Sequence, residues 1–192
     1  MELLEAIKNR RSIRKYTDKQ ILREDLEKII EAGTYASNAG GCQRSMIVGI
    51  RNAELVEKLG KMNMAKFDRG NLIGSYVSKE QPSVIDDPTI KSGFYGAPAL
   101  CIVFAQKNFM FGIPDAFCCA ETMLIEAFDL GISSCIVSRA EETFDNEIGA
   151  ALLKEWGVPE NYIARCFVTL GYCDGEYPKS KPRKENRSKI IE

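Results

Sequence analysis

The sequence predicts an α+β protein in which helices flank a central sheet. Helix-like and strand-like segments follow one another in the order α-α-β-α-β-α-β-α-β along 192 residues. The segment 99–105 is almost continuously apolar, which is typical of a strand buried on both faces. We find no internal repeat and no linker, so residues 1–192 are predicted to form a single domain.

Apolar residues spaced three or four positions apart predict the helices in order. The first is short and ends near residues 8–11; the others cover residues 25–35, 53–66, 115–130 and 148–156. Glycines follow the last two, at Gly131 and Gly157, as expected at helix ends. The helix 115–130 is apolar almost all round, so we expect it to be enclosed in the core or at a subunit interface.

Short apolar runs predict the strands, and small or polar residues predict the loops. Strands are expected at residues 46–50, 99–105, 133–137 and 163–170. Residues 34–45 form a glycine-containing loop, residues 67–92 an irregular excursion, and residues 174–192 a basic C-terminal extension.

Composition restricts the function. The formal net charge is −1, which gives no overall attraction to nucleic acid or to an anionic membrane. Neither an apolar span nor a secretion signal is visible, which predicts a cytoplasmic protein. The chain has no histidine, and its seven cysteines match no metal-binding pattern, so no metal site is expected. If the chain is an enzyme, a cofactor is expected to supply the chemistry.

A basic cluster lies near the start of the chain, where Arg10, Arg11, Ser12 and Arg14 fall within five residues. Guanidinium groups bind phosphate oxygens in pairs, and a serine hydroxyl adds a hydrogen bond. Taken alone, the cluster fits a solvated helix end equally well. A second basic stretch, around Lys181 and Arg183, closes the chain, and one phosphate would draw both together.

The loop 36–43 contains adjacent glycines and the amides Asn38 and Gln43. Glycines let a ligand approach the backbone, and amide side chains both donate and accept hydrogen bonds. Such a loop suits a heterocycle with carbonyl and imide edges, although turn chemistry alone would also explain it.

Together these motifs resemble the nitroreductase family over essentially the whole chain. The resemblance implies a mainly antiparallel sheet, an intertwined homodimer, and one FMN in each cleft between subunits. It also implies hydride transfer from NADH or NADPH through flavin N5 to an electron-poor acceptor, such as a nitroaromatic or quinone, with ping-pong kinetics. The FMN-binding positions that it implies are Arg10, Arg11, Ser12 and Arg14 with Lys181 and Arg183 at the phosphate, Ser37, Asn38, Ala39, Gly41 and Gln43 from the partner subunit, Asn63 at the pyrimidine edge, and Val137 and Ser138 near N5.

The chain also departs from the family pattern. Ser37, Asn38 and Gly41 replace the usual Pro, Ser and Asn of the loop, and Ser138-Arg139 stands where some members have Glu-Gly beside the ring. Substrate shape therefore does not carry over from the resemblance. Three alternatives remain: a flavin-dependent dehalogenase or ene reductase on the same fold, an FMN-binding protein without turnover, and a helical anion-binding interaction module that binds no flavin.

Overall fold

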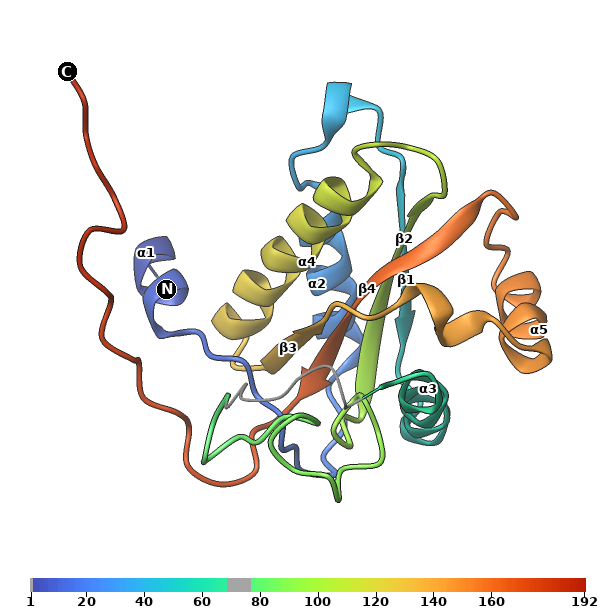
Figure 1. Cartoon of the computed structure of the whole chain (residues 1–192), viewed down its shortest axis with the longest axis horizontal. Coiled ribbons are helices and arrows are strands. Elements are labelled where there is room, and N and C mark those ends of the chain that lie inside the picture. Colours follow the sequence, from blue (N-terminus) through green and yellow to red (C-terminus); the bar gives the residue numbers. More distant parts are fainter. Residues whose placement is uncertain (1, 69–76) are drawn as a thin grey trace.

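The computed structural model describes residues 2–68 and 77–192 (Figure 1). Its elements occur in the predicted order, joined by two short 3-10 turns. The helices and turns are α1 Leu3–Asn9, α2 Arg23–Thr34, η1 Ala39–Gly41, α3 Ala53–Ala65, α4 Gly112–Asp129, η3 Glu141–Phe144 and α5 Glu147–Glu155, and the strands are β1 Ser45–Ile50, β2 Ala99–Gln106, β3 Ser133–Val137 and β4 Tyr162–Gly171.

The four strands form one antiparallel sheet in the order β1-β2-β4-β3. This confirms the α+β class with a mainly antiparallel sheet. β2 and β4 occupy the centre, and every residue of β2 except Gln106 is buried, as its apolar run predicted. β3 is an edge strand, and the N-terminal segment meets it through a parallel bridge between Ser12 and Ser134.

Helices cover both faces of the sheet, as Figure 1 shows. On one face α2 and α4 pack on the alternate β2 residues Ala99, Cys101 and Val103. On the other face α3, η3 and α5 pack on Leu100, Ile102 and Phe104. The period-two alternation of a strand therefore supplies two separate apolar cores from one run of residues.

A β-bulge interrupts the pairing of β2 with β4. Val103 pairs with Cys166, but the next residue, Phe104, pairs with Ala164, so Arg165 has no partner across the ladder. A bulge re-aims the side chain at the extra residue. Here it turns Arg165 toward the polar region between α4 and η3, where the cation is 8% exposed.

Two helices begin two or more residues earlier than predicted. α2 starts at Arg23, two residues before the expected start, and α4 starts at Gly112, three residues early. The first turn of α4 contains Pro114, and a proline is tolerated there because first-turn amides have no partner within the helix. The predicted loop 34–45 contains the short turn η1, with Gly40 and Gly41 at positive φ.

The excursion predicted at residues 67–92 is described in part, because residues 69–76 lie outside the described residues. From 77 to 92 the chain forms turns without a helix or strand. The Asp86 carboxylate organises this stretch by accepting hydrogen bonds from the backbone amides of Val77, Ser78 and Ser83.

The C-terminal extension runs alongside the N-terminal segment. Thr17 N donates to Tyr172 O at 2.9 Å, and Asp174 N donates to Lys15 O at the same distance. The ammonium of Lys15 also lies 2.8 Å from the Asp174 carboxylate. The two ends of the chain are therefore joined before the tail continues outward past α1 (Figure 1).

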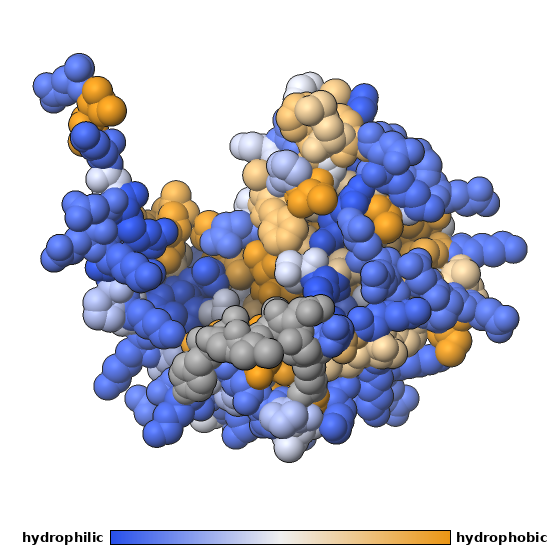
Figure 2. All heavy atoms as spheres, viewed as in Figure 1, coloured by the Kyte–Doolittle hydropathy of each residue, from blue (hydrophilic) through white to orange (hydrophobic). Residues whose placement is uncertain are grey.

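One face of α4 remains uncovered by its own chain. Ile113 is 51% exposed, and Phe117, Ile125 and Phe128 are only partly buried. Figure 2 shows apolar side chains gathered along α4, between the polar surfaces on either side. α1 likewise exposes Leu3, Leu4 and Ile7. Among the described residues no helix is both long and apolar enough to cross a membrane.

Candidate functional site

The basic cluster near the start of the chain adopts an extended conformation along β3. Ile13 N donates to Ser134 O at 3.0 Å, and the Ile13 side chain is completely buried. Successive side chains of an extended segment point to opposite sides, so Arg10, Ser12 and Arg14 share the side opposite Ile13. A single buried isoleucine thereby sets the direction of the three polar side chains.

These three side chains converge on Cys135, a buried residue of β3. Burial raises the pKa of the Cys135 thiol, and Arg14, a hydrogen bond from Ser12, and Arg10 act in the opposite direction. Nε and Nη1 of Arg10 are buried without a hydrogen bond, although Nε lies 3.6 Å from a Glu121 carboxylate oxygen. Buried donors without acceptors are costly, so the arrangement fits an anion with several oxygens, such as a phosphate.

Arg11 is separated from the other cations of the cluster. Its Nη1 donates to the carbonyl oxygens of Lys8 and Arg10, which caps the end of α1. Its backbone amide donates to the Tyr177 hydroxyl at 2.9 Å, and the Tyr177 ring packs against Phe128. Tyr177 therefore joins the C-terminal extension both to Arg11 and to α4.

The other predicted cations lie on the C-terminal extension. Lys181 Nζ donates to Val77 O at 3.0 Å, and Arg183 is exposed. A residue not anticipated from the sequence, Gln81, links this region to the basic cluster: it is 1% exposed, and its Oε1 accepts from Arg14 N at 2.6 Å. Lys181 and Arg14 are thus both attached to the excursion.

The predicted loop residues Ser37, Asn38, Ala39, Gly41 and Gln43 lie around η1. The side-chain oxygen Oδ1 of Asn38 accepts a hydrogen bond from Gln43 N at 2.9 Å, which shapes the loop. Ala39 N donates a hydrogen bond to the Asp115 carboxylate at 3.0 Å. Asp115 is in the first turn of α4, whereas Arg10 faces Glu121, about 9 Å further along the helix. Within this chain the loop and the cations are therefore attached to different parts of α4.

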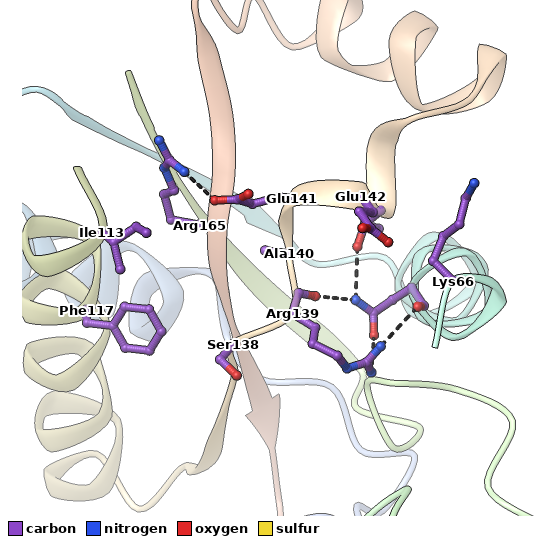
Figure 3. Close-up of a pocket in the computed structure, with 11 residues that line it drawn as sticks. Lys66, Ile113, Phe117, Ser138, Arg139, Ala140, Glu141, Glu142 and Arg165 are labelled. Carbon is purple, nitrogen blue, oxygen red and sulfur yellow. Dashed lines mark hydrogen bonds and ion pairs between the residues drawn. The ribbon is translucent and has the colours of Figure 1, made fainter. Parts of the chain in front are cut away.

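A pocket of about 360 Å³ opens at the C-terminal end of β3 (Figure 3). Ser138 and Asn63 line it, and Val137 packs into the core beside it. Asn63 is 3% exposed; its Nδ2 donates to Arg139 O and to Thr143 Oγ1, the latter at 2.9 Å. The pocket therefore contains two of the predicted site residues, with a third directly behind them.

Arg139 is a partly buried cation of this pocket. Its Nη2 donates to Asn63 Oδ1 at 2.9 Å, and its Cζ lies 3.8 Å from the centre of the Phe67 ring. Burial lowers the pKa of Arg139. The sequence marks this position only as a departure from Glu-Gly, and it gives no signal for Lys66, which lines the pocket from the C-terminal cap of α3.

The opposite wall combines apolar and charged side chains. Ile113 and Phe117 approach from α4, and Arg165 approaches from the bulge of β4 (Figure 3). The Arg165 guanidinium bonds the Glu141 carboxylate and donates to the carbonyl oxygens of Gln106 and Lys107. This neutralised cation fixes η3 to the sheet and closes the pocket on that side.

Comparisons with known proteins agree with this geometry. The model of the Nitroreductase family matches residues 7–172. A crystal structure of a nitroreductase with bound FMN from Bacteroides fragilis is 32% identical, with both chains covered completely and a TM-score of 0.80. A nitroreductase with bound FMN from Desulfitobacterium hafniense is 22% identical over 100% of this chain and 99% of its own, with a TM-score of 0.78, which supports the fold.

Curated sequences give the same result. A protein from Archaeoglobus fulgidus named NADH dehydrogenase/NAD(P)H nitroreductase is 29% identical over 172 residues, which is 89% of this chain and 85% of the relative. A protein of the same name from Methanothermobacter thermautotrophicus is 26% identical over 90% of this chain and 78% of its own length. With the match to the family model, these relationships show that the chain belongs to the nitroreductase family.

Proposed function

We propose that this chain is an FMN-dependent oxidoreductase that uses NADH or NADPH to reduce an electron-poor acceptor. The observation that carries the proposal is that Arg10, Ser12 and Arg14 share one side of an extended segment bridged to β3, with two buried guanidinium nitrogens of Arg10 lacking hydrogen bonds. The family membership and the FMN in the Bacteroides fragilis relative support phosphate as the missing acceptor.

The residues present fit FMN along the length of β3. Arg10, Ser12 and Arg14 would hold the phosphate at one end of the strand, with Lys181 and Arg183 closing over it. The backbone amides near Val137 and Ser138 would face the ring at the other end. Asn63 Oδ1 accepts one hydrogen bond, from Arg139. Its second lone pair would be available to accept a hydrogen bond from the edge of the FMN ring.

A homodimer would complete the site. The uncovered apolar face of α4 requires a cover, and a two-fold pair of the same helix is the simplest one. Antiparallel pairing of two α4 helices would place the Ala39 loop of one protomer near the C-terminal half of its partner's helix. The loop residues Ser37, Asn38, Ala39, Gly41 and Gln43 would thereby reach the second cofactor.

When held by these residues, FMN would supply the hydride-transfer chemistry between NADH or NADPH and a nitroaromatic or quinone. The work of the chain is binding and orientation. Its cations neutralise the phosphate, and Ile113 and Phe117 provide an apolar wall that excludes water from the reacting face. Since the chain contains no histidine, no imidazole takes part.

The test begins with the purified protein. We expect a yellow protein whose flavin absorbance bleaches anaerobically on addition of NADH or NADPH and returns when a nitroaromatic or a quinone is added. Initial rates at varied concentrations of both substrates should give the parallel double-reciprocal lines of ping-pong kinetics. A flavoprotein that stays oxidised with both reductants would instead be a non-catalytic FMN-binding protein, and a chain that remains colourless after incubation with FMN would contradict the proposal.

A further inference from the structure

Gln81 is a buried polar side chain in an irregular part of the chain. It is 1% exposed, although it lies in the turns between residues 77 and 92. A buried amide is costly unless its oxygen and its nitrogen both have hydrogen-bond partners. Gln81 Oε1 accepts from Arg14 N at 2.6 Å, and Nε2 donates to Cys173 Sγ at 3.7 Å. Both partners therefore lie in other segments, and one of them is a cation proposed to hold the FMN phosphate.

The contact with Arg14 completes the pairing of the segment that carries the cations. Ile13 N points toward β3, where it donates to Ser134 O at 3.0 Å. Consecutive amides of an extended segment point in opposite directions, so Arg14 N points away from β3, toward the outer edge of the segment. Gln81 Oε1 supplies the acceptor on that side. The segment is therefore held by a strand at Ile13 and by a single side chain at Arg14.

The turn that carries Gln81 is itself fixed. Gln81 N donates to Ser78 Oγ at 3.0 Å, which sets the position of its backbone. The Asp86 carboxylate accepts hydrogen bonds from the amides of Val77 and Ser78. The same turn holds the second predicted phosphate cation, because Lys181 Nζ donates to Val77 O at 3.0 Å. One short stretch of chain thus contacts cations from both ends of the sequence.

The Tyr95 hydroxyl gives Arg14 a second support. Burial raises the pKa of Tyr95, and hydrogen bonds with the Val84 amide and with the Arg14 side chain act in the opposite direction. Val84 follows Gln81 by three residues, so the turn reaches the Arg14 backbone directly and its guanidinium through Tyr95. Gln81 and Tyr95 are both uncharged at neutral pH. They therefore orient Arg14 without neutralising it, and its charge is kept for an anion.

We propose that Gln81 is a positioning residue of the phosphate site. Through the Arg14 backbone it holds the Arg14 guanidinium toward the phosphate, and it thereby favours phosphorylated flavin over riboflavin. An arginine that is oriented in advance loses less side-chain freedom on binding, so its hydrogen bonds contribute more to affinity. This inference rests on the proposed function, because it concerns the FMN phosphate in the same site.

The test compares FMN with riboflavin, which has the same ring and ribityl chain but no phosphate. Fluorescence titrations of the full-length protein, freed of flavin, give a Kd for each, and the ratio of the riboflavin Kd to the FMN Kd is the phosphate preference. Gln81→Met keeps the length of the side chain but removes its amide. We expect the phosphate preference to fall about tenfold, the size of one hydrogen bond to a charged group, with riboflavin affinity unchanged.

Gln20→Met is the matched control. Gln20 also bonds the backbone at both ends of its amide, since Nε2 donates to Pro98 O at 2.8 Å and Oε1 accepts from Ile21 N at 2.9 Å. Neither partner belongs to the phosphate site, so this variant should keep the wild-type phosphate preference even where it lowers stability. Adding Gln81→Met to Arg14→Ala should not lower the preference further, because Gln81 acts through Arg14.

Gln81→Asn is the milder change and gives the same test if Gln81→Met does not fold. Its amide is retained on a side chain one methylene shorter, which no longer reaches Arg14 N from the same backbone position. We expect the same fall in phosphate preference as in Gln81→Met. Circular dichroism of each variant reports on the fold separately.

A wild-type phosphate preference in the folded Gln81 variants would overturn the inference. So would an equal loss in Gln20→Met, or a further tenfold loss when Gln81→Met is added to Arg14→Ala, since Gln81 would then act independently of this cation. Riboflavin that binds the wild-type protein as tightly as FMN would contradict the phosphate site of the proposed function. A wild-type protein that prefers FMN, with the same preference in the Gln81 variants, contradicts only the inference.

Discussion

The two ends of β3 carry cations that are held in opposite ways. At the Ser134 end, Arg10 and Arg14 project from an extended segment, and they are positioned by backbone contacts to Ser134 and Gln81. At the Val137 end, Arg139 is held through its own guanidinium by Asn63 and Phe67. At the Ser134 end several hydrogen-bond donors share one side of the segment and remain available. At the Val137 end there is one oriented cation, and Ile113 and Phe117 form an apolar wall of the same pocket.

This difference separates two tasks within one site. Converging donors suit a small multivalent anion and provide affinity. At the second end, Arg139 donates to Asn63 and lines the same pocket as Ser138, so this cation stands beside the position proposed for the FMN ring. Variants at the first end should therefore mainly change cofactor retention, and variants at the second should mainly change the environment of the ring.

The largest effect is expected from Arg10→Ala combined with Arg14→Ala. Each guanidinium provides hydrogen bonds worth about 1.5–3 kcal/mol to a charged partner, so the pair should weaken FMN binding roughly 100-fold or more. Flavin content after gel filtration and a fluorescence titration of the apoprotein measure the change. Circular dichroism should show an intact fold, and wild-type flavin occupancy would contradict the assignment of the phosphate site.

A smaller loss of stability is expected from Gly149→Ala, at the Val137 end of β3. A Cβ at this position of α5 would lie 2.5 Å from Phe144 O, so η3, which forms a wall of the pocket, would have to shift. Such overpacking costs about 1–3 kcal/mol. Urea unfolding should show this loss, and the absorbance spectrum of bound flavin should change because Thr143 of η3 holds Asn63. Ala151→Gly, at an exposed site of the same helix, should lower stability by about 1 kcal/mol without changing that spectrum.

Tyr177→Phe tests whether the C-terminal extension supports the cations at the Ser134 end of β3. It removes the acceptor of the Arg11 amide but keeps the ring on Phe128, and a hydrogen bond of this kind contributes about 1 kcal/mol. We expect FMN to dissociate a few-fold faster. Tyr35→Phe, at a residue 80% exposed, is the control. Equal dissociation rates in the two variants would mean that the extension does not support the cation segment.

The smallest effect concerns pH. Burial raises the pKa of Cys135 above its ordinary value of 9.0, so the folded state keeps the thiol proton that the unfolded state releases. This contribution is complete below pH 9 and is lost as the pH rises above it. Between pH 8 and 10.5 the wild-type unfolding free energy should therefore fall more steeply than that of Cys135→Ala. Parallel pH profiles would show that the neighbouring cations already offset the burial of the thiol.

The elements of the fold were predictable because their signals are local. The apolar run of β2 and the helical spacing of α4 are visible within a few residues, and the order of all nine main elements is confirmed. Their ends were less accurate, as at α4, where Pro114 concealed a start at Gly112. Sequence spacing does not show that proline fits the first turn of a particular helix.

The site was less predictable because its contacts join distant parts of the chain. Nothing near Arg11 indicates that its amide meets Tyr177, and nothing near Arg14 indicates Gln81. The cluster 10–14 looked uniform, yet the burial of Ile13 turns Arg11 away from its neighbours. Arg139 was noticed only as an unusual residue, because its isolation from carboxylates depends on how α3 and η3 pack together.

The junction between the two chain ends has a consequence for the synthesis of the protein. The Arg11 amide meets a hydroxyl 166 residues later, and Lys15 meets Asp174. A ribosome adds these two partners 159 and 166 residues after Lys15 and Arg11. A growing polypeptide therefore carries Arg11 and Lys15 without these contacts until residues 174–177 have been translated.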